Sequence, residues 1–290
     1  MIIVTGATGQ LGRQIVERLL TRVPADRIGV SVRDPQKARG FADQGVRVRH
    51  GSFTDAGSLA HAFEGASQVL IVSVDKMGDE AVRQHRAAID GAVAAGARRI
   101  LYTSHMGAGA ASRFQPCRDH AATEDALRAS GVAFTSLRNG FYAANALQFL
   151  GDAPTSGSVA LPADGPVSWT AHADLADAAA AVLADEGRFD GPTPPLTAAQ
   201  ALTFDDLAAI AGECTGRTVT RTTTTDEQFR EQLVGHGVPA EAAAQLLGVF
   251  TAARAGEFAA VDPTLATLLG REPTTLSTLL REQLATAASH

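Results

Sequence analysis

Short apolar runs alternate with amphipathic segments along the first half of the chain. Runs rich in Ile, Val and Leu have the length of buried strands at 2–5, 28–32, 46–50, 69–74, 100–103 and 134–137. Between these runs, helical patterns lie over 10–22, 35–44, 56–63, 79–95 and 123–129. Strands that alternate with helices are typical of a parallel sheet joined by right-handed crossovers. The pattern predicts an α/β fold with a doubly wound parallel sheet.

The pattern changes after Asn139. Proline and glycine interrupt residues 154–166, where only 159–161 form a short apolar piece, and 222–225 read as a strand or loop. Helices are expected from about 172 to 183, and over 203–214, 226–236, 239–256 and 275 to the end. We expect two domains: a nucleotide-binding domain over 1–150, with the helix 172–184 packing back on it, and a smaller, mostly helical substrate-binding lobe over 151–290.

Three glycines, at positions 6, 9 and 12, follow the first apolar run. Gly6 allows a tight turn, Gly9 lets the backbone approach a pyrophosphate, and Gly12 lets the next helix pack closely on the strand. The N–H groups at the start of that helix face the anion, and the helix dipole favours its negative charge. An ordinary glycine-rich turn is the alternative. The apolar strand before the glycines and the amphipathic helix after them favour a dinucleotide site of the Rossmann type.

The end of the second strand is where such a fold reads the ribose. An acid there accepts from the 2′-hydroxyl of NADH, but Arg33 occupies the tip, and a guanidinium suits a 2′-phosphate. Lys37 adds a second positive charge one turn later. Alternatively, Arg33 pairs with Asp34 or solvent, or Asp34 itself reaches the ribose. We favour NADPH as the cofactor.

A proton-donating pair common in reductases of this fold is missing. Short-chain reductases commonly use a Tyr with a Lys four residues later, where the Lys lowers the pKa of the phenol. Here Tyr102 is followed by Met106, and Tyr142 by Ala146. A hydride acceptor that needs no strong enzyme acid fits better, such as a quinone or a cationic dye.

The composition of the chain argues against several classes of partner. The net charge of −6 and the lack of a basic stripe argue against nucleic acid. The two cysteines, Cys117 and Cys214, have no metal-ligand spacing, so we expect no metal and a reducing, cytoplasmic location. The first strand begins at Ile2, so no signal peptide is expected, and the apolar runs are too short for a membrane span.

Several stretches together resemble a known family. They are VTGATGQLGRQIVERL (4–19), VRDPQKA (32–38), DHAATE (119–124), LRNGFY (137–142), LTFDDLA (202–208) and LLGR (268–271). They resemble the NmrA-like atypical short-chain dehydrogenase/reductase family, and within it the bacterial type-2 NAD(P)H:quinone oxidoreductases and the triphenylmethane reductases. The glycine motif is shared by many reductases, whereas the His-x-x-Thr-Glu and Leu-Arg-Asn-Gly pieces are more specific.

The resemblance implies an NADPH site lined by segments from several strand ends. The implied cofactor-binding residues are Gly6, Ala7, Thr8, Gly9, Gln10, Leu11, Arg33, Ser73, Val74, Asp75, Leu137, Arg138, Asn139, Gly140, Phe141 and Tyr142. It places Asn139 and its neighbours near the nicotinamide.

Two residues are candidates for catalysis, His120 and Tyr142. His120 and Glu124 lie at i and i+4 on a helix, so His120 is a proton donor or substrate orienter poised by Glu124, since imidazole titrates near neutral pH. Alternatively, the two form a hydrogen-bonded pair at the helix start that fixes the preceding loop. Phe141 and Tyr142 form an aromatic wall against a flat substrate, or they are core residues.

The function expected is an NADPH-dependent oxidoreductase that transfers hydride to a quinone or a similar planar conjugated acceptor. One alternative is a redox sensor that binds NADP(H) without turnover, which the missing Tyr/Lys pair motivates equally well. Another is a tailoring reductase of secondary metabolism. A homodimer is expected only because related proteins often pair.

Overall fold

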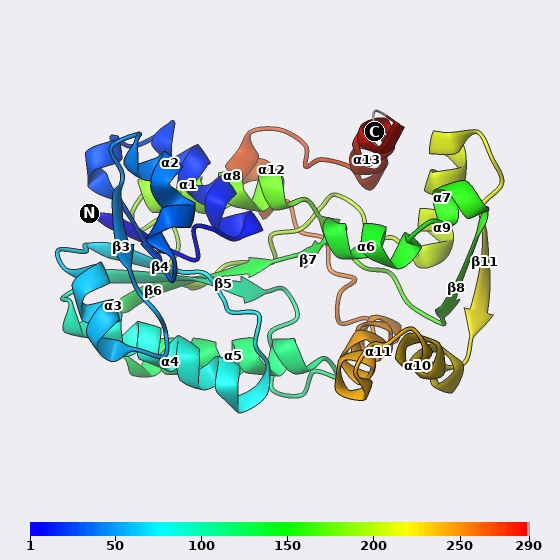
Figure 1. Cartoon of the computed structure of the whole chain (residues 1–290), viewed down its shortest axis with the longest axis horizontal. Coiled ribbons are helices and arrows are strands. Elements are labelled where there is room, and N and C mark those ends of the chain that lie inside the picture. The colour runs from blue at the N-terminus through cyan, green and yellow to red at the C-terminus, as the bar shows by residue number, and fades with distance from the viewer. Residues whose placement is uncertain (289–290) are drawn as a thin grey trace. The chain divides into compact units, whose positions relative to one another are not determined.

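The computed structural model describes residues 1–288 and contains the expected parallel sheet (Figure 1). Its seven strands lie in the order β10-β6-β5-β4-β1-β2-β3, and every neighbouring pair is parallel. The order reverses between β1 and β4, which is the switch point of a doubly wound sheet. The strands are β1 (Ile2–Thr5), β2 (Ile28–Val32), β3 (Arg47–His50), β4 (Gln68–Ile71), β5 (Arg99–His105), β6 (Ala133–Asn139) and β10 (Gly191–Pro192).

Helices cover both faces of this sheet. In Figure 1, α1 (Gln10–Leu20), α2 (Arg39–Ala42) and α8 (His172–Ala184) lie above it, and α3 (Ala56–Phe63), α4 (Gly78–Ala94) and α5 (Gln115–Ala129) lie below. The apolar stripe of α1 is buried, with Ile15, Val16 and Leu19 fully enclosed. Below the sheet, Leu59, Phe63 and Ile89 pack on the apolar side chains of β4 and β5. Burial on both faces explains why the strands read as continuous apolar runs.

The sheet and its alternation with helices were predicted correctly, but several bounds were not. The helix expected over 123–129 begins at Gln115, because Pro116 is tolerated in a first turn, where its missing N–H would have no partner. The strand expected over 69–74 ends at Ile71. Beyond it, the backbone N–H groups of Val72 and Ser73 donate to threonine hydroxyls of neighbouring strands instead of the ladder.

The chain forms two compact units. The first unit comprises residues 1–110, 116–139 and 172–196, and the second comprises 111–115, 140–171 and residues from 197 onward. Helix α8 thus belongs to the unit that holds the sheet, and Asp174 lies in its first turn. The domain ranges 1–150 and 151–290 stay a prediction about separately folding parts.

The second unit is mostly helical. Its helices are α6 (Ala143–Leu150), α7 (Ala153–Ser156), α9 (Phe204–Thr215), α10 (Asp226–Gly235), α11 (Ala240–Arg254), α12 (Thr264–Leu269) and α13 (Leu276–Ala288). Two small parallel pairs join them, β8 (Ser158–Pro162) with β11 (Thr220–Thr224), and β7 (Phe141–Tyr142) with β9 (Trp169–Thr170). The sequence pattern did not predict α6, α7 and α12. The last two residues of the helix expected from 275 to the end lie outside the described residues.

Aromatic side chains fill the centre of the second unit. The Phe204 and Phe250 rings stack with centroids 5.4 Å apart, and Trp169 meets Phe204 edge-on at 5.7 Å. No helix in the part of the chain that the structure describes is both long enough and apolar enough to cross a membrane.

Candidate functional site

The loop between β1 and α1 is built around glycines that no other residue could replace without strain. Gly6 has φ +62°, its N–H donates to the Ser31 carbonyl at 3.2 Å, and its own carbonyl accepts from Gly9 N–H at 2.9 Å. A Cβ on Gly12 would lie 2.3 Å from the Gly6 carbonyl oxygen. The loop therefore closes tightly against the start of the helix.

The start of α1 presents open hydrogen-bond donors. Gly9 is the N-cap and supplies no side-chain hydrogen bond, so the first-turn N–H groups have no partner within the helix. Gly9 and Gln10 are exposed, and the loop lies beside the end of β4, where Val72 N–H donates to Thr5 Oγ1 at 2.9 Å. An uncapped helix start at the switch point fits a pyrophosphate, because the N–H groups and the helix dipole both attract an anion.

The tip of β2 presents positive charge. Arg33 and Lys37 are both exposed, and within residues 1–288 neither forms an ion pair. The neighbouring Asp34 caps the short helix that follows it by accepting from Gln36 N–H at 3.0 Å. Of the alternatives for this tip, the structure therefore does not pair Arg33 with Asp34. The arrangement fits a 2′-phosphate better than a bare ribose hydroxyl.

The segment after β4 is held by side chains of other elements. Ser73 N–H donates to Thr103 Oγ1 at 2.9 Å, and Val74 N–H donates to His85 Nε2 at 3.0 Å. Next to it lies a cavity of about 230 Å³. Its lining comes from this segment, α4 and α5: Val74, Asp75, Lys76, Met77, Ala81, His85, Pro116, Asp119 and His120.

The residues predicted around the end of β6 fall into different surroundings. Leu137 is fully buried, and Asn139 is 2% exposed with an Oδ1 atom that has no hydrogen-bond partner in the described residues. A buried acceptor without a partner fits the amide donor of a nicotinamide, since burying a polar group without a hydrogen bond is costly.

Gly140, Phe141 and Tyr142 belong to the second unit. The Phe141 ring lies in its core, with the Trp169 ring at 5.3 Å and the Phe258 ring at 5.0 Å between centroids. Of the two interpretations of Phe141, the structure favours the core residue. Tyr142 is half-buried, and its role stays a prediction.

The expected pairing of His120 with Glu124 is wrong. Glu124 is 1% exposed, and its carboxylate accepts from Arg138 Nε at 3.1 Å, Arg138 Nη2 at 2.7 Å and Ser104 Oγ at 2.8 Å. The hydrogen bond to Glu124 raises the pKa of Arg138 above its ordinary value. The i, i+4 spacing was read correctly, but a guanidinium from β6 matches both carboxylate oxygens, which an imidazole cannot do. Arg138 and Glu124 thus link β6 to α5.

His120 instead contacts a tyrosine. Its Nδ1 atom lies 2.7 Å from the Tyr102 hydroxyl, which also lies 3.4 Å from His85 Nδ1. Burial lowers the pKa of His85 to about 4, and it lowers the pKa of His120 well below the usual range, with further lowering by His105 and His85. Both imidazole rings are therefore held neutral near pH 7.

Sequence reasoning missed Tyr102 and His85 as parts of this arrangement. Tyr102 lay inside an expected strand and His85 inside an expected helix, and nothing in their spacing relates them to His120.

The thiol of Cys117 is fully buried, with Sγ 3.2 Å from His105 Nδ1, in agreement with a packed thiol. In the described part of the chain, no group of three or more His, Cys, Asp or Glu side chains is arranged to hold a metal ion.

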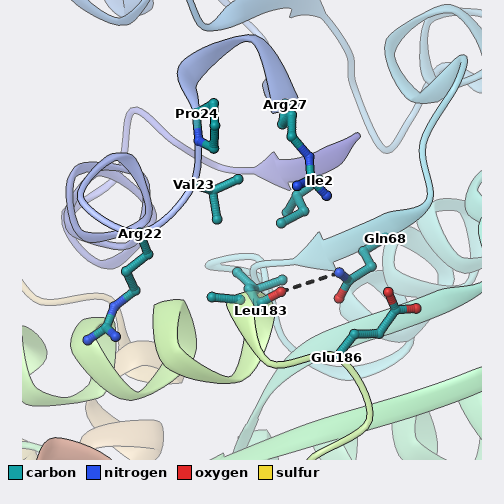
Figure 2. Close-up of a pocket in the computed structure, with 9 residues that line it drawn as sticks. Ile2, Arg22, Val23, Pro24, Arg27, Gln68, Leu183 and Glu186 are labelled. Atoms are coloured by element: carbon teal, nitrogen blue, oxygen red, sulfur yellow. Dashed lines mark hydrogen bonds between the residues drawn. The ribbon is translucent and has the colours of Figure 1, made fainter.

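A second cavity, of about 170 Å³, lies at the opposite, amino edge of the sheet. Figure 2 shows Ile2, Arg22, Arg27 and Glu186 around it, with the Gln68 amide donating to the Leu183 carbonyl at 3.3 Å. Ligands of doubly wound sheets bind outside the carboxyl ends of the strands, so this cavity is not where a dinucleotide would lie.

Comparison with known proteins shows the family of this chain. The model of the NmrA-like family matches residues 1–280. The chain belongs to the NmrA-like family. Quinone oxidoreductase 2 of Escherichia coli is 35% identical over 281 residues, which are 96% of each chain. An NAD(P)H azoreductase of Xenophilus azovorans is 28% identical over 98% of each chain.

Solved structures of the family share the whole architecture. The NADPH complex of the E. coli NADPH-dependent quinone oxidoreductase superposes with a TM-score of 0.92 at 34% identity, covering 98% of this chain and all of the other. The NADP(H) complex of the triphenylmethane reductase of Citrobacter sp. has a TM-score of 0.90 at 35% identity, covering 98% and 99%. The predictions of family and fold class are confirmed.

Proposed function

We propose that this protein is an NADPH-dependent reductase that transfers hydride to a quinone or a similar planar conjugated acceptor. Two features together carry the proposal. The start of α1 follows a tight glycine loop and has no side-chain cap, and Arg33 instead of an acid lies at the tip of β2. The named activities of the relatives, which are quinone, azo-dye and triphenylmethane reductases, support the choice of acceptor.

Different residues bind the different parts of NADPH in this proposal. The first-turn N–H groups of α1 hold the pyrophosphate, Arg33 and Lys37 hold the 2′-phosphate, and buried Asn139 orients the nicotinamide through its carboxamide. The bound cofactor supplies the hydride. The chain supplies orientation and exclusion of water, which bring the two reactants together without a strong acid.

His120 and Tyr142 are the proposed contacts to the acceptor. His120 lines the cavity beside the segment after β4, so it can donate a hydrogen bond to an acceptor oxygen there. For Tyr142, contact with a flat acceptor stays a prediction. A reducing, cytoplasmic location stays a prediction. A homodimer stays a prediction that size-exclusion chromatography can test.

The test is NADPH oxidation followed by absorbance with purified protein and a panel of benzoquinones, naphthoquinones, azo dyes and triarylmethane dyes. We expect acceptor-dependent oxidation with at least one class, and slower oxidation of NADH. Tight NADPH binding by calorimetry with no turnover across the panel would replace the reductase by an NADP(H) sensor. Absence of any binding would refute both functions.

A further inference from the structure

Three side chains from three elements form a chain of hydrogen bonds that ends at the cavity beside α4 and α5. Tyr102, on β5, is fully buried, with its hydroxyl between two imidazoles. His85 comes from α4 and His120 from α5, with ring centroids 5.2 Å and 5.6 Å from the Tyr102 ring. Of the three, His120 and His85 line the cavity.

The hydrogen bonds of His85 determine its tautomer. Its Nε2 atom accepts from Val74 N–H at 3.0 Å, so this nitrogen carries no proton. The proton of the neutral ring is therefore on Nδ1, which lies 3.0 Å from Thr123 Oγ1. Thr123 Oγ1 donates its own proton to the Asp119 carbonyl at 2.8 Å, so it accepts from His85. His85 is a fixed donor facing the Tyr102 hydroxyl, 3.4 Å away.

This fixed donor decides where the Tyr102 proton points. Of the two imidazole nitrogens near the hydroxyl, His85 Nδ1 already carries a proton, and only His120 Nδ1 can accept. The Tyr102 hydroxyl therefore donates to His120 at 2.7 Å. The proton of the neutral His120 ring is then on Nε2, the nitrogen left to serve a group in the cavity.

We propose that Tyr102 is the source of the proton in the reduction and that His120 relays it to the substrate oxygen. The inference rests on the proposed function, because a quinone that accepts hydride becomes an oxyanion that needs one proton. The Nε2–H bond of His120 breaks as the O–H bond of the product forms, while the Tyr102 proton moves to His120 Nδ1. Tyr102 becomes a phenolate that shares the single His85 Nδ1–H with Thr123 Oγ1, and His120 stays neutral in its other tautomer.

The resting state returns by the reverse path. His120 Nδ1 gives its proton back to the phenolate, and Nε2 takes a proton from water that enters the cavity. One proton enters from water for each one delivered, so the cycle balances. Tyr102 and His85 thus perform the work that a Tyr with a neighbouring Lys performs in other reductases: one supplies the proton and the other stabilises the phenolate.

The charged and titratable groups around the relay support this direction. From α4 and β5 come His85 and His105, and from the segment after β4 come Asp75 and Lys76, which line the cavity. On α5, Asp119 accepts from Gly78 N–H at 2.7 Å, and Glu124 is bound by Arg138. Because burial lowers the pKa of His120 well below its usual range, an imidazolium donor is scarce at neutral pH. A neutral ring can deliver a proton only by receiving another at Nδ1.

The relay predicts that loss of the Tyr102 hydroxyl affects one class of acceptor only. Reduction of 1,4-naphthoquinone needs a proton, whereas malachite green, a cationic dye, becomes neutral on accepting hydride and needs none. Tyr102→Phe should lower kcat for the naphthoquinone about 10- to 100-fold and leave kcat for the dye within about two-fold of the wild type.

The matched control is Ser136→Ala. Ser136 lies opposite Tyr102 in the β5–β6 register, is fully buried, and its Oγ has no hydrogen-bond partner in the described residues. Ser136→Ala tests removal of a buried hydroxyl at the same level of the sheet, and reduction of both the naphthoquinone and the dye should be unchanged.

His120→Asn is a second variant in case Tyr102→Phe does not fold. Its amide keeps a hydrogen bond to Tyr102 but cannot exchange tautomers, so the same split between acceptors is expected.

A further readout does not depend on the dye. Added imidazolium should restore naphthoquinone reduction by Tyr102→Phe or His120→Asn and leave the wild type unchanged, because an external acid replaces the missing relay. Wild-type rates in the variants, equal losses with both acceptors, or no recovery with imidazolium would each overturn the relay and leave the reductase function standing. No oxidation of NADPH by the wild type with any acceptor of the panel would refute the function and the relay together.

Discussion

The two sides of the sheet's carboxyl edge differ in how their polar groups are exposed: one side leaves them open to solvent, and the other buries them. At β1 and β2, the proposed binding groups are backbone N–H groups and exposed cations that the fold leaves open to solvent. At β5, α4 and α5, the proposed functional groups are buried side chains that hydrogen-bond to one another. Binding an anion needs donors that remain available, whereas moving a proton along a defined path needs donors kept away from bulk water.

The difference also separates two kinds of constraint. Proposed phosphate binding at β1 and β2 depends on the positions of the glycines, because the backbone of this loop must come close both to a ligand and to its own next turn. The proton side depends on pKa values and tautomers, which burial and neighbouring hydrogen bonds set. Substitutions should therefore affect cofactor affinity on the first side and pH behaviour on the second.

The largest effect is expected from Gly12→Val. Its Cβ would lie 2.3 Å from the Gly6 carbonyl oxygen, so the loop must open and its N–H groups lose their alignment. NADPH affinity measured by calorimetry should fall about 1,000-fold, or about 4 kcal/mol. Gly40→Val is the control, because a Cβ on Gly40 of α2 meets nothing within 4 Å. Equal affinities for the two variants would contradict the close packing of the cradle.

The next effect concerns acid stability on the proton side. Burial lowers the pKa of His85 to about 4 from the 6.5 of an unperturbed histidine. The unfolded chain therefore binds this proton below pH 6.5, while the folded chain binds it only near pH 4. The stabilisation is complete above pH 6.5 and is lost as the pH falls toward 4, by about 3 kcal/mol.

Urea unfolding at pH 7, 6, 5 and 4 measures this loss. The free energy of unfolding should fall by about 3 kcal/mol less in His85→Gln than in the wild type over that range. His61→Gln, at an exposed histidine of α3, is the control and should follow the wild type. Parallel curves for wild type and His85→Gln would show that His85 is not held neutral.

The smallest effect is expected at Arg33, where one exposed side chain chooses between cofactors. Arg33→Ala should raise the KM for NADPH about 10- to 30-fold, the value of one charge-assisted hydrogen-bonding group, and leave the KM for NADH unchanged. Arg83→Ala, at an exposed arginine of α4, is the control for net charge. A loss shared by both cofactors would place Arg33 away from the 2′-phosphate.

Much of the first unit could be predicted from the chain because its signals are local. The strand expected at 2–5 and the helix expected at 56–63 have the observed bounds, since each combines an apolar pattern with a clear stop. Helix α9 likewise has a capping box at Thr203 and Asp206 and a left-handed C-cap at Gly216. The start of α5 was missed because Pro116 and the polar residues after it resemble a loop until they pack.

In the candidate site, too, features with local signals could be predicted, and contacts between distant elements could not. The glycine loop and Arg33 could be proposed as binding groups from the sequence because that proposal needs only their position relative to one strand. The partner of His120 was not found, because helical spacing suggests Glu124 while the fold gives Glu124 to Arg138. Spacing along one helix shows which side chains are neighbours, but it does not show which competing partner from another element binds more strongly.

The amino-acid order by itself determined that the chain makes a parallel sheet with a tight glycine loop at its first turn, because strand pattern, glycine spacing and helix start lie within a dozen residues. Only the tertiary structure decided that Tyr102, His85 and His120 meet. They come from a strand and two helices, and their hydrogen bonds exist only after the sheet has brought those elements together and removed the water between them.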